Sequence, residues 1–352
     1  SLTRREGSNP SFSVIFLKKN KLFILAIVID VLMAIFLFLA YGPISYFRDL
    51  LITTAMTTKS HKYIARTLYS ERTIAKVMSG NSIEEIDEDT DSSQINFDSI
   101  QESDHYESIY EEQVLKKEDN NDYKVVPISG TGYQGYMVVV YDASKVSLAS
   151  TAYLGKTGQI LRDITKNYKA QLGINAGGFA DASGVGDGGT PTGTVISNGK
   201  ILYRGPDTGW EGGLIGFNKD HVLVLTKESP ETAIQNGMID AVEFGPFLVV
   251  NGKSAITKGN GGGGVSSRTV IAQRKDGIVL FFIIDGRQPG YSIGISLSEM
   301  TELLTRYKAY NAANLDGGAS TTLVINNKLA NKPCGIGGTG ERRIPNAWIV
   351  KN

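Results

Sequence analysis

The sequence predicts an α+β fold for residues 123–352, with a mainly antiparallel or mixed sheet and few helices. Two observations predict this fold. Short runs rich in β-branched residues alternate with turn signals throughout the region, which holds 37 of the chain's 40 glycines. Only two segments of it, Gln159–Tyr168 and Ser298–Lys308, have the apolar spacing of helices.

The expected strands are short, and turn sequences such as Asn251-Gly252 join several of them into hairpins. Ser296 and Glu299 have the spacing of a capping box, which predicts where the second helix begins. The expected strands are Tyr136–Tyr141, Gly193–Ile196, Leu214–Phe217, Val222–Thr226, Phe247–Val250, Thr269–Gln273, Val279–Asp285 and Thr322–Ile325.

A long apolar stretch, Leu22–Tyr41, lies near the N-terminus and is interrupted only by Asp30. About 20 helical residues cross a hydrocarbon core of about 30 Å. Lysines precede the stretch, so the positive-inside rule predicts that residues 1–21 are cytoplasmic and that the rest is extracellular. A cleaved signal peptide is the alternative, but its apolar core should be shorter, and residues 39–47 are a poor small-x-small cleavage site. We therefore expect an uncleaved signal-anchor in the cell membrane.

Two segments separate this stretch from the α+β region. Residues 42–80 contain apolar side chains at helical spacing, which predicts a stalk helix. Residues 81–122 hold 15 Asp or Glu against 2 Lys or Arg and few large apolar residues. Such a segment buries too little apolar surface to offset its ordering entropy, so we expect a flexible or weakly ordered acidic linker.

Composition excludes several classes of site. The single cysteine, Cys334, excludes an intrachain disulfide framework and a cysteine-based zinc site. Residues 123–352 carry a scattered excess of positive charge with no basic run, so no nucleic-acid partner is expected. The three histidines are His61, His105 and His221, in the stalk, in the linker and beside a hairpin turn. A Ser-His-Asp mechanism would therefore lack its base.

Two predicted strands each end in an aspartate followed by glycine, at Asp285-Gly286-Arg287 and at Asp316-Gly317-Gly318. A single helix lies between these strands. If it makes a parallel crossover, both carboxylates reach the same edge of one sheet. Glycines beside a carboxylate let a ligand approach the backbone. Two ordinary Asp-Gly turns are the alternative interpretation.

Other glycine-rich segments accompany these two motifs. Gly173–Phe179 repeats the pattern of a short apolar run, a polar residue and glycines. Gly259–Gly264 has no Gly-Lys-Ser/Thr after it, so we expect a flexible loop beside a site and not a Walker motif. The loop Asp181–Pro191 has too few oxygen ligands for a calcium loop. No cofactor is indicated, and a divalent cation such as calcium stays open as an alternative without being indicated.

Three arginines, Arg268, Arg287 and Arg342, flank the glycine motifs, and arginine forks suit phosphate oxygens. The glycine and arginine motifs, in the order in which they occur along the chain, resemble those of the phosphodiester glycosidase family over about Val125–Asn352. Ala176 and Ala319 stand where glycine is usual, which removes no polar group. The anchor and stalk resemble those of bacterial members labelled exopolysaccharide proteins. The motifs are Asn175–Phe179, Phe244–Val249, Ser267–Thr269, Asp285–Arg287, Asn314–Thr322, and Arg342 with Asn346-Ala347.

The resemblance implies a hydrolase that cleaves between sugar C1 and phosphate in a glycosyl phosphodiester of a cell-surface glycan. It implies that Asp316 acts at C1 with Asp285 as its partner, and that Arg268 and Arg287 hold the phosphate. A non-catalytic glycan-binding or exopolysaccharide-assembly module is one alternative, and a metal-dependent phosphodiesterase is the other. The remaining residues expected to bind substrate are Asn175, Gly177, Gly178, Gly317, Gly318, Ser320, Thr321 and Arg342.

Overall fold

The computed structural model divides into two compact units, Ser1–Leu51 and Ile52–Asn352. The boundary falls within helix α2 (Ser45–Thr57). The described residues are 11–58, 61–97, 105–117, 122–181, 186–205, 212–335 and 340–352, with side chains from residue 21 onward.

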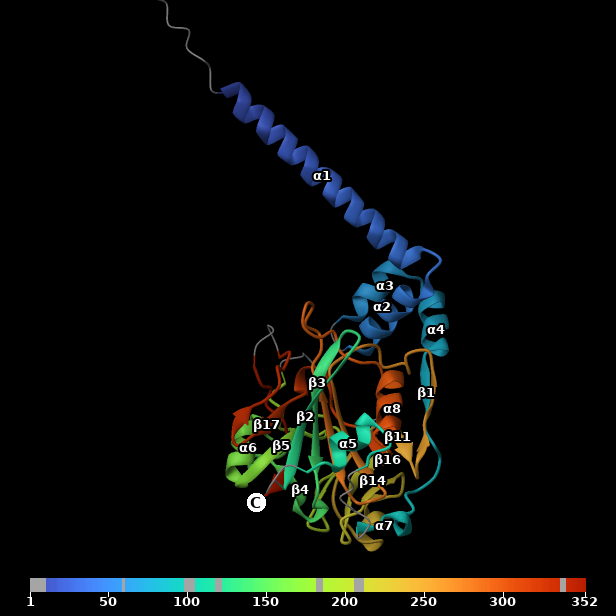
Figure 1. The fold of residues 1–352 in the computed structure, drawn as a ribbon, viewed down its shortest axis with the longest axis vertical. Coiled ribbons are helices and arrows are strands. Elements are labelled where there is room, and N and C mark those ends of the chain that lie inside the picture. Colours follow the sequence, from blue (N-terminus) through green and yellow to red (C-terminus); the bar gives the residue numbers. More distant parts are fainter. Residues whose placement is uncertain are drawn as a thin grey trace, which may run out of the picture. The chain divides into compact units, whose positions relative to one another are not determined.

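The first unit contains one long helix, α1 (Ser11–Tyr41), drawn in dark blue in Figure 1. Its part Lys21–Tyr41 has a mean hydropathy of 3.1 and is long and apolar enough to cross a membrane. A signal sequence near the N-terminus can meet the same criteria of length and hydropathy, so membrane anchoring stays a prediction. Of the basic residues of the expected cytoplasmic segment, Arg4, Arg5, Lys18 and Lys19 lie outside the residues whose side chains are described, and Lys21 is exposed.

Residues 42–80, expected to form a stalk helix, instead form three helices: α2, α3 (Lys62–Leu68) and α4 (Glu71–Gly80). From Ile52 onward they belong to the same compact unit as the α+β region. Ile52, Ala65 and Ile74 are buried there. A helical spacing of apolar residues predicts a buried face, but it does not identify the surface that covers that face.

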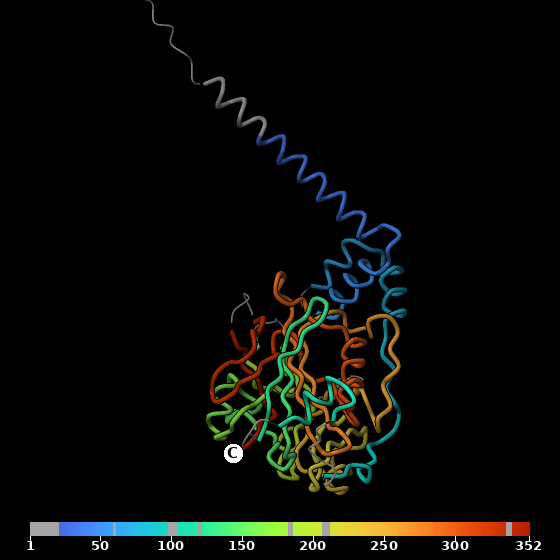
Figure 2. Tube along the Cα trace, in the orientation of Figure 1, coloured from blue at the N-terminus to red at the C-terminus, as the bar shows by residue number. Residues whose placement is uncertain are grey.

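The expected linker also packs against this unit in its described parts. β1 (Ser82–Glu84) pairs antiparallel with β13 (Ile256–Lys258), and the two segments run side by side in Figure 2. Val114 of α5 (Ile109–Leu115) is fully buried. The flexible-linker expectation is wrong for these parts because the acidic side chains are paired across the unit. The pairs are Glu85–Lys227, Glu88–Lys253, and Glu107 and Glu111 with Lys308. Residues 98–104 and 118–121 of the expected linker lie outside the described residues.

Three larger sheets make up the α+β region, and every strand pairing in the described residues is antiparallel. The seven-stranded sheet has the order β12 (Lys253–Ser254), β11 (Phe247–Val250), β16 (Ala309–Asn314), β14 (Arg268–Arg274), β15 (Val279–Ile284), β3 (Tyr133–Val140) and β2 (Tyr123–Gly130). The second sheet has the order β18 (Lys328–Leu329), β17 (Leu323–Ile325), β5 (Ala170–Asn175), β19 (Asn346–Lys351) and β4 (Val146–Ser150). The third has the order β7 (Lys200–Tyr203), β6 (Val195–Ser197), β10 (Met238–Phe244), β8 (Gly213–Asn218) and β9 (Leu223–Thr226).

Side chains from all three sheets form one buried core, in which Phe217 and Trp348 pack edge to face at 5.4 Å. Helix α8 (Leu297–Arg306) packs Met300 and Leu304 with buried residues of the seven-stranded sheet into a second core. Burial on both faces explains why β15 is apolar at every position. Helices α6 (Leu161–Asn167) and α7 (Pro230–Gln235) complete the unit. The predicted α+β fold, mainly antiparallel with few helices, is confirmed.

Candidate active site

The two Asp-Gly motifs lie at the same edge of the seven-stranded sheet. β15 and β16 both pair antiparallel with β14, so they run in the same direction, and α8 makes the crossover between them. Asp285 follows β15 directly, and Asp316 follows β16 by two residues. Arg268, the first residue of β14, faces Ile284 in the ladder and therefore starts at this edge.

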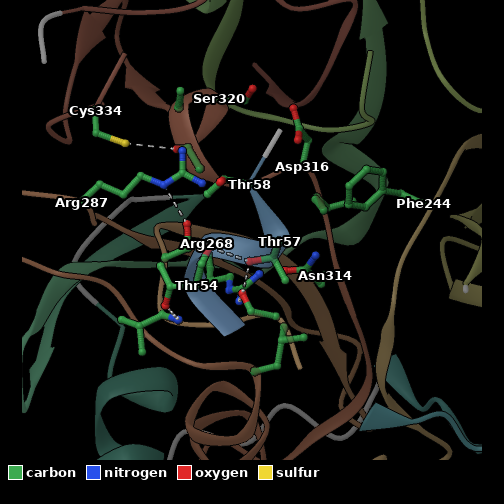
Figure 3. Close-up of a pocket in the computed structure, with 18 of the residues that line it drawn as sticks. Thr54, Thr57, Thr58, Phe244, Arg268, Arg287, Asn314, Asp316, Ser320 and Cys334 are labelled. Carbon is green, nitrogen blue, oxygen red and sulfur yellow. Dashed lines mark hydrogen bonds between the residues drawn. The ribbon is translucent and has the colours of Figure 1, made fainter. Parts of the chain in front are cut away.

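A cavity of about 780 Å³ opens at this edge (Figure 3). Its size is within the range of about 300–1,000 Å³ that small-molecule sites have. In Figure 3, Arg287 and Cys334 lie on one side of it and Phe244 on the other, with Asp316 between them. Of the residues predicted for the site, those that line the cavity are Asp316, Arg268, Arg287, Gly317, Gly318, Ser320 and Arg342. Those that do not are Asp285, Asn175, Gly177, Gly178 and Thr321.

The backbone of Asp316 is held by the end of β5 in the second sheet. Its N–H donates to the carbonyl of Ala176 at 3.0 Å, and its carbonyl accepts from Asn175 Nδ2 at 2.6 Å. Asn175 Oδ1 accepts from Thr269 Oγ1 at 2.8 Å and from the N–H of Thr322 at 3.0 Å. Asn175 is buried outside the cavity, so it positions the Asp316 loop and does not reach a ligand.

Arg268 is a buried cation, and no ion pair of the described residues includes it. Its Nη2 donates to the carbonyls of Gly263 and Gly264 at 2.8 and 2.9 Å, while Nε points to Ile295 O at 3.4 Å. Burial, and secondarily the charge of Arg287, lowers the pKa of Arg268 to about 10. It therefore stays charged at neutral pH. A buried charge is costly unless it is paired, and an anion in the cavity would supply the counter-charge.

Arg287 extends over the glycine turn that follows Asp316. Its backbone is left-handed at φ 59°, and its Nε donates to Ser266 Oγ at 3.1 Å. Gly318 lies directly beneath the guanidinium and is itself left-handed, at φ 61°. Ser267 fixes this turn: its Oγ donates to Gly318 O at 2.7 Å, and its carbonyl accepts the Gly318 N–H at 2.9 Å.

Arg342 lines the cavity, and its guanidinium contacts two other residues of the protein. It pairs with Asp181 at 2.6 Å and lies 4.7 Å from the centre of the Phe179 ring. Both side chains of the ion pair are largely buried. This arrangement holds Arg342 in one orientation toward the cavity, with less conformational entropy to lose when a ligand binds.

Asp285 is not in the cavity, and this corrects its expected place beside Asp316. It is 1% exposed and accepts hydrogen bonds from Tyr291 Oη at 2.9 Å, Asn331 Nδ2 at 2.8 Å and the N–H of Lys332 at 3.2 Å. Burial raises the pKa of its carboxyl, although these hydrogen bonds oppose the shift. Asp285 thus fixes the segment that delivers Cys334 to the wall.

The two glycines of the Asn175–Phe179 motif have different structural roles behind the cavity. A Cβ on Gly178 would lie 2.7 Å from the Phe244 ring, so glycine lets that ring form a wall of the cavity. The N–H of Gly177 donates to Asn346 Oδ1 at 2.7 Å. Thr321 is buried behind the wall, with its Oγ1 3.4 Å from Thr269 Oγ1.

The chain before the α+β region also lines the cavity, which sequence reasoning missed. His61, expected in the stalk, stands in the wall. Thr54 Oγ1 accepts from the N–H of Val265 at 3.3 Å, and Thr53 Oγ1 accepts from Asn260 Nδ2 at 2.7 Å. No periodicity links such residues to a site more than 200 positions away. Phe179, Phe244 and Asn314 also line the cavity, and they lie in the family-like motifs without having been assigned a role. The lining residues absent from our expectation include Thr54, Thr57, Thr58, His61, Asp181 and Cys334.

Among the described residues, no group of three or more His, Cys, Asp or Glu is arranged to hold a metal ion. In the loop considered for calcium, the Asp181 carboxylate pairs with Arg342, and Asp187 Oδ1 accepts from the N–H of Gly189. Residues 182–185 of that loop lie outside the described part of the chain.

A family model described as phosphodiester glycosidase matches residues 168–351. The chain is 27% identical over 158 residues to the N-acetylglucosamine-1-phosphodiester alpha-N-acetylglucosaminidase of Bos taurus, over 40% of this chain and 29% of that protein. It is 42% identical over 69 residues to the Homo sapiens protein of that name, over 20% of this chain and 13% of that protein. The matched part thus spans less than a third of these relatives.

The solved catalytic domain of the zebrafish protein of the same name, auto-inhibited by its pro-peptide, has a similar structure. The TM-score is 0.53 at 22% identity, and the match covers 68% of this chain and 87% of that chain. This likeness supports the fold found for the matched part of the chain.

Proposed function

This chain belongs to the phosphodiester glycosidase family, and from that premise we propose that it hydrolyses glycosyl phosphodiesters between sugar C1 and phosphate. One observation supports this proposal most directly. The carboxylate of Asp316 shares a cavity with Arg268 and Arg287, and the side-chain contacts of both arginines among the described residues are with uncharged groups. A carboxylate beside two cations suits a reaction in which positive charge develops at a carbon atom of the substrate and the leaving group departs as an anion.

The proposed chemistry follows from these charges. As the bond from C1 to the phosphate oxygen breaks, positive charge grows at C1, and the Asp316 carboxylate stabilises it as base or as nucleophile. The departing phosphate monoester keeps the electron pair of that bond, and it needs little protonation. Arg268 and Arg287 stabilise its charge. Water supplies the hydroxyl group that ends on C1, and the proton that the water loses is taken up by the Asp316 carboxylate or by the departing phosphate.

The substrate is proposed to be a cell-surface glycan or glycopolymer outside the membrane. The apolar helix at Lys21–Tyr41 supports an anchored enzyme with an extracellular domain. The relatives from Bos taurus and Homo sapiens are named for N-acetylglucosamine 1-phosphodiesters. We propose sugar 1-phosphodiesters as the substrate class, with that amino sugar as the first compound to test.

We further propose that the segment from Thr53 to Thr58 controls access to the cavity. The zebrafish domain is auto-inhibited by its pro-peptide. Here Thr53 and Thr54 are joined to the Asn260–Val265 loop by two side-chain hydrogen bonds. Thr53→Ala with Thr54→Ala removes both bonds, so kcat/KM for a polymeric substrate should rise several-fold. Thr73→Ala, on α4 outside the cavity lining, is the control. An unchanged or lower rate would show that the segment is a fixed wall.

The proposed activity is tested with the full chain in detergent micelles and a panel of sugar 1-phosphodiesters. Release of free sugar is measured in water labelled with heavy oxygen. Label in the sugar supports cleavage at C1. Label in the phosphate would identify a phosphodiesterase that cuts P–O, while binding without release would favour a glycan-binding module.

A further inference from the structure

Asn314, the last residue of β16, has a side-chain oxygen without a hydrogen-bond donor. Its Nδ2 donates to the carbonyl of Gly245 at 3.0 Å. A carbonyl can only accept, so this contact fixes which end of the amide is nitrogen. Oδ1 is buried and has no partner among the described residues. The side chain as a whole is 5% exposed and lines the cavity.

Buried polar atoms in folded proteins almost always have partners, and an exception in a ligand cavity calls for an explanation. Five other buried side-chain atoms of the described residues are likewise unpartnered, but none of their residues lines the cavity. They are Ser147 Oγ, Ser150 Oγ, Glu341 Oε1, Asn346 Nδ2 and Trp348 Nε1. Asn314 differs because a bound molecule can bring the missing donor to it. The unpaired atom accepts hydrogen bonds, so the ligand group must carry N–H or O–H.

The place of Asn314 indicates which part of the ligand that group belongs to. Side chains alternate along an extended chain. Leu315 lies between Asn314 and Asp316 with its side chain buried in the core, and all three residues line the cavity. Phe244 stands in the same wall and offers an aromatic surface. A ring held against Phe244, with its C1 near Asp316, presents its substituents to the neighbouring Asn314.

We propose that Asn314 Oδ1 accepts a hydrogen bond from a donor substituent of the sugar ring and thereby determines which sugar is cleaved. The inference rests on the proposed function, because it takes the ligand to be a glycosyl phosphodiester. The donor is a ring hydroxyl or the N–H of an acylamino group, which share this chemistry. A site that satisfies its buried acceptor in this way discriminates strongly against the analogue that lacks the donor.

The test pairs substrate changes with side-chain changes in the full chain. The probes are the methyl phosphodiesters of α-glucose and α-N-acetylglucosamine, each with its singly deoxygenated or deaminated analogues. The wild type should lose about 10-fold or more in kcat/KM on one analogue. Asn314→Leu should lose a similar factor on the parent compound and nothing further on that analogue. The analogue on which wild type and Asn314→Leu have the same kcat/KM lacks the donor substituent. It therefore shows whether that donor is a ring hydroxyl or the N–H of an acylamino group.

Two further variants keep the test decisive. Asn314→Asp retains an acceptor but cannot donate to the Gly245 carbonyl, so it should be less stable and still keep selectivity for the parent. Asn346→Leu removes a buried asparagine outside the cavity and should leave the parent-to-analogue ratio unchanged. If the ratio is the same in wild type and both Asn314 variants for every analogue, the inference is wrong.

Binding measured by calorimetry separates this inference from the proposed function. Selective binding that depends on Asn314, without hydrolysis, would overturn the proposed function and support the role of Asn314. Hydrolysis with a selectivity that does not depend on Asn314 would support the proposed function and overturn the role of Asn314. Neither binding nor hydrolysis of any probe would overturn both.

Discussion

The guanidinium of Arg287 lies against the Cα of Gly318, so closely that a Cβ built there would be 2.8 Å from Nη2. Gly318 is also left-handed, a conformation that L side chains rarely adopt. The glycine therefore has two functions: it completes the turn after Asp316 and it leaves space for the arginine. The two residues belong to different motifs, which the sheet edge brings together.

Gly318→Ala is expected to lower both stability and activity. The left-handed backbone should cost about 1 kcal/mol, and the methyl group would push Arg287 out of place. Gly199 is the matched control, since it is left-handed at φ 68° with nothing within 4 Å of an added Cβ. Gly199→Ala should lose a similar amount in urea denaturation and keep full hydrolysis. Equal activity of the two variants would contradict the packing argument.

Asp316→Asn should keep the fold and lose turnover, because it removes a charge and almost no volume. Loss of a single catalytic carboxylate can reduce kcat by about 10⁴-fold. Asp163→Asn, on the exposed first turn of α6, is the control for a general effect of charge. Release of sugar from the parent phosphodiester is the measurement. Near-normal turnover by folded Asp316→Asn would remove the central residue of the mechanism.

Arg287→Gln should weaken anion binding without unfolding the protein, since Arg287 is exposed and makes one side-chain hydrogen bond to Ser266. Inorganic phosphate should raise the melting temperature of the wild type by stabilising the bound state. The rise should be much smaller in Arg287→Gln and unchanged in Arg162→Gln, since Arg162 is an exposed residue of α6 whose ion pair with Glu341 lies outside the cavity lining. If phosphate raises the melting temperature equally in all three proteins, the anion site is elsewhere.

The sequence was most informative where strand, helix and turn signals agreed. The two Asp-Gly strands and the capped helix between them suffice to predict that both aspartates reach one sheet edge, and the ladders with β14 confirm this. The predicted helix Ser298–Lys308 is observed as Leu297–Arg306, with the capping box of Ser296 and Glu299 in place.

The sequence could not predict which side of the edge each carboxylate faces. Asp285 and Asp316 have the same local pattern, yet Asn331 and Lys332 cover the first from 46 and 47 positions away. The same limit explains His61 and the acidic segment. Their neighbours in the fold come from distant parts of the chain, and composition alone indicates only that such segments lack a core of their own.

Asp285 gives a prediction about pH. Burial raises its pKa in the folded state above the ordinary value, which is about 3.9 for the unfolded chain. Between these two values the folded state binds the proton and the unfolded state does not. Stability contributed by this group is therefore fully present below the unfolded value and is lost as pH rises through the folded pKa.

The comparison of wild type with Asp285→Asn isolates this contribution, because the variant cannot titrate there. The variant should be less stable throughout, since an amide cannot accept from Tyr291, Asn331 and Lys332 together. As pH falls from 7 toward 4, the wild type should gain stability relative to the variant. Urea denaturation of both full-length proteins at each pH gives this difference. If the wild type instead loses stability relative to Asp285→Asn as pH falls, the native hydrogen bonds outweigh burial and the pKa of Asp285 is lowered.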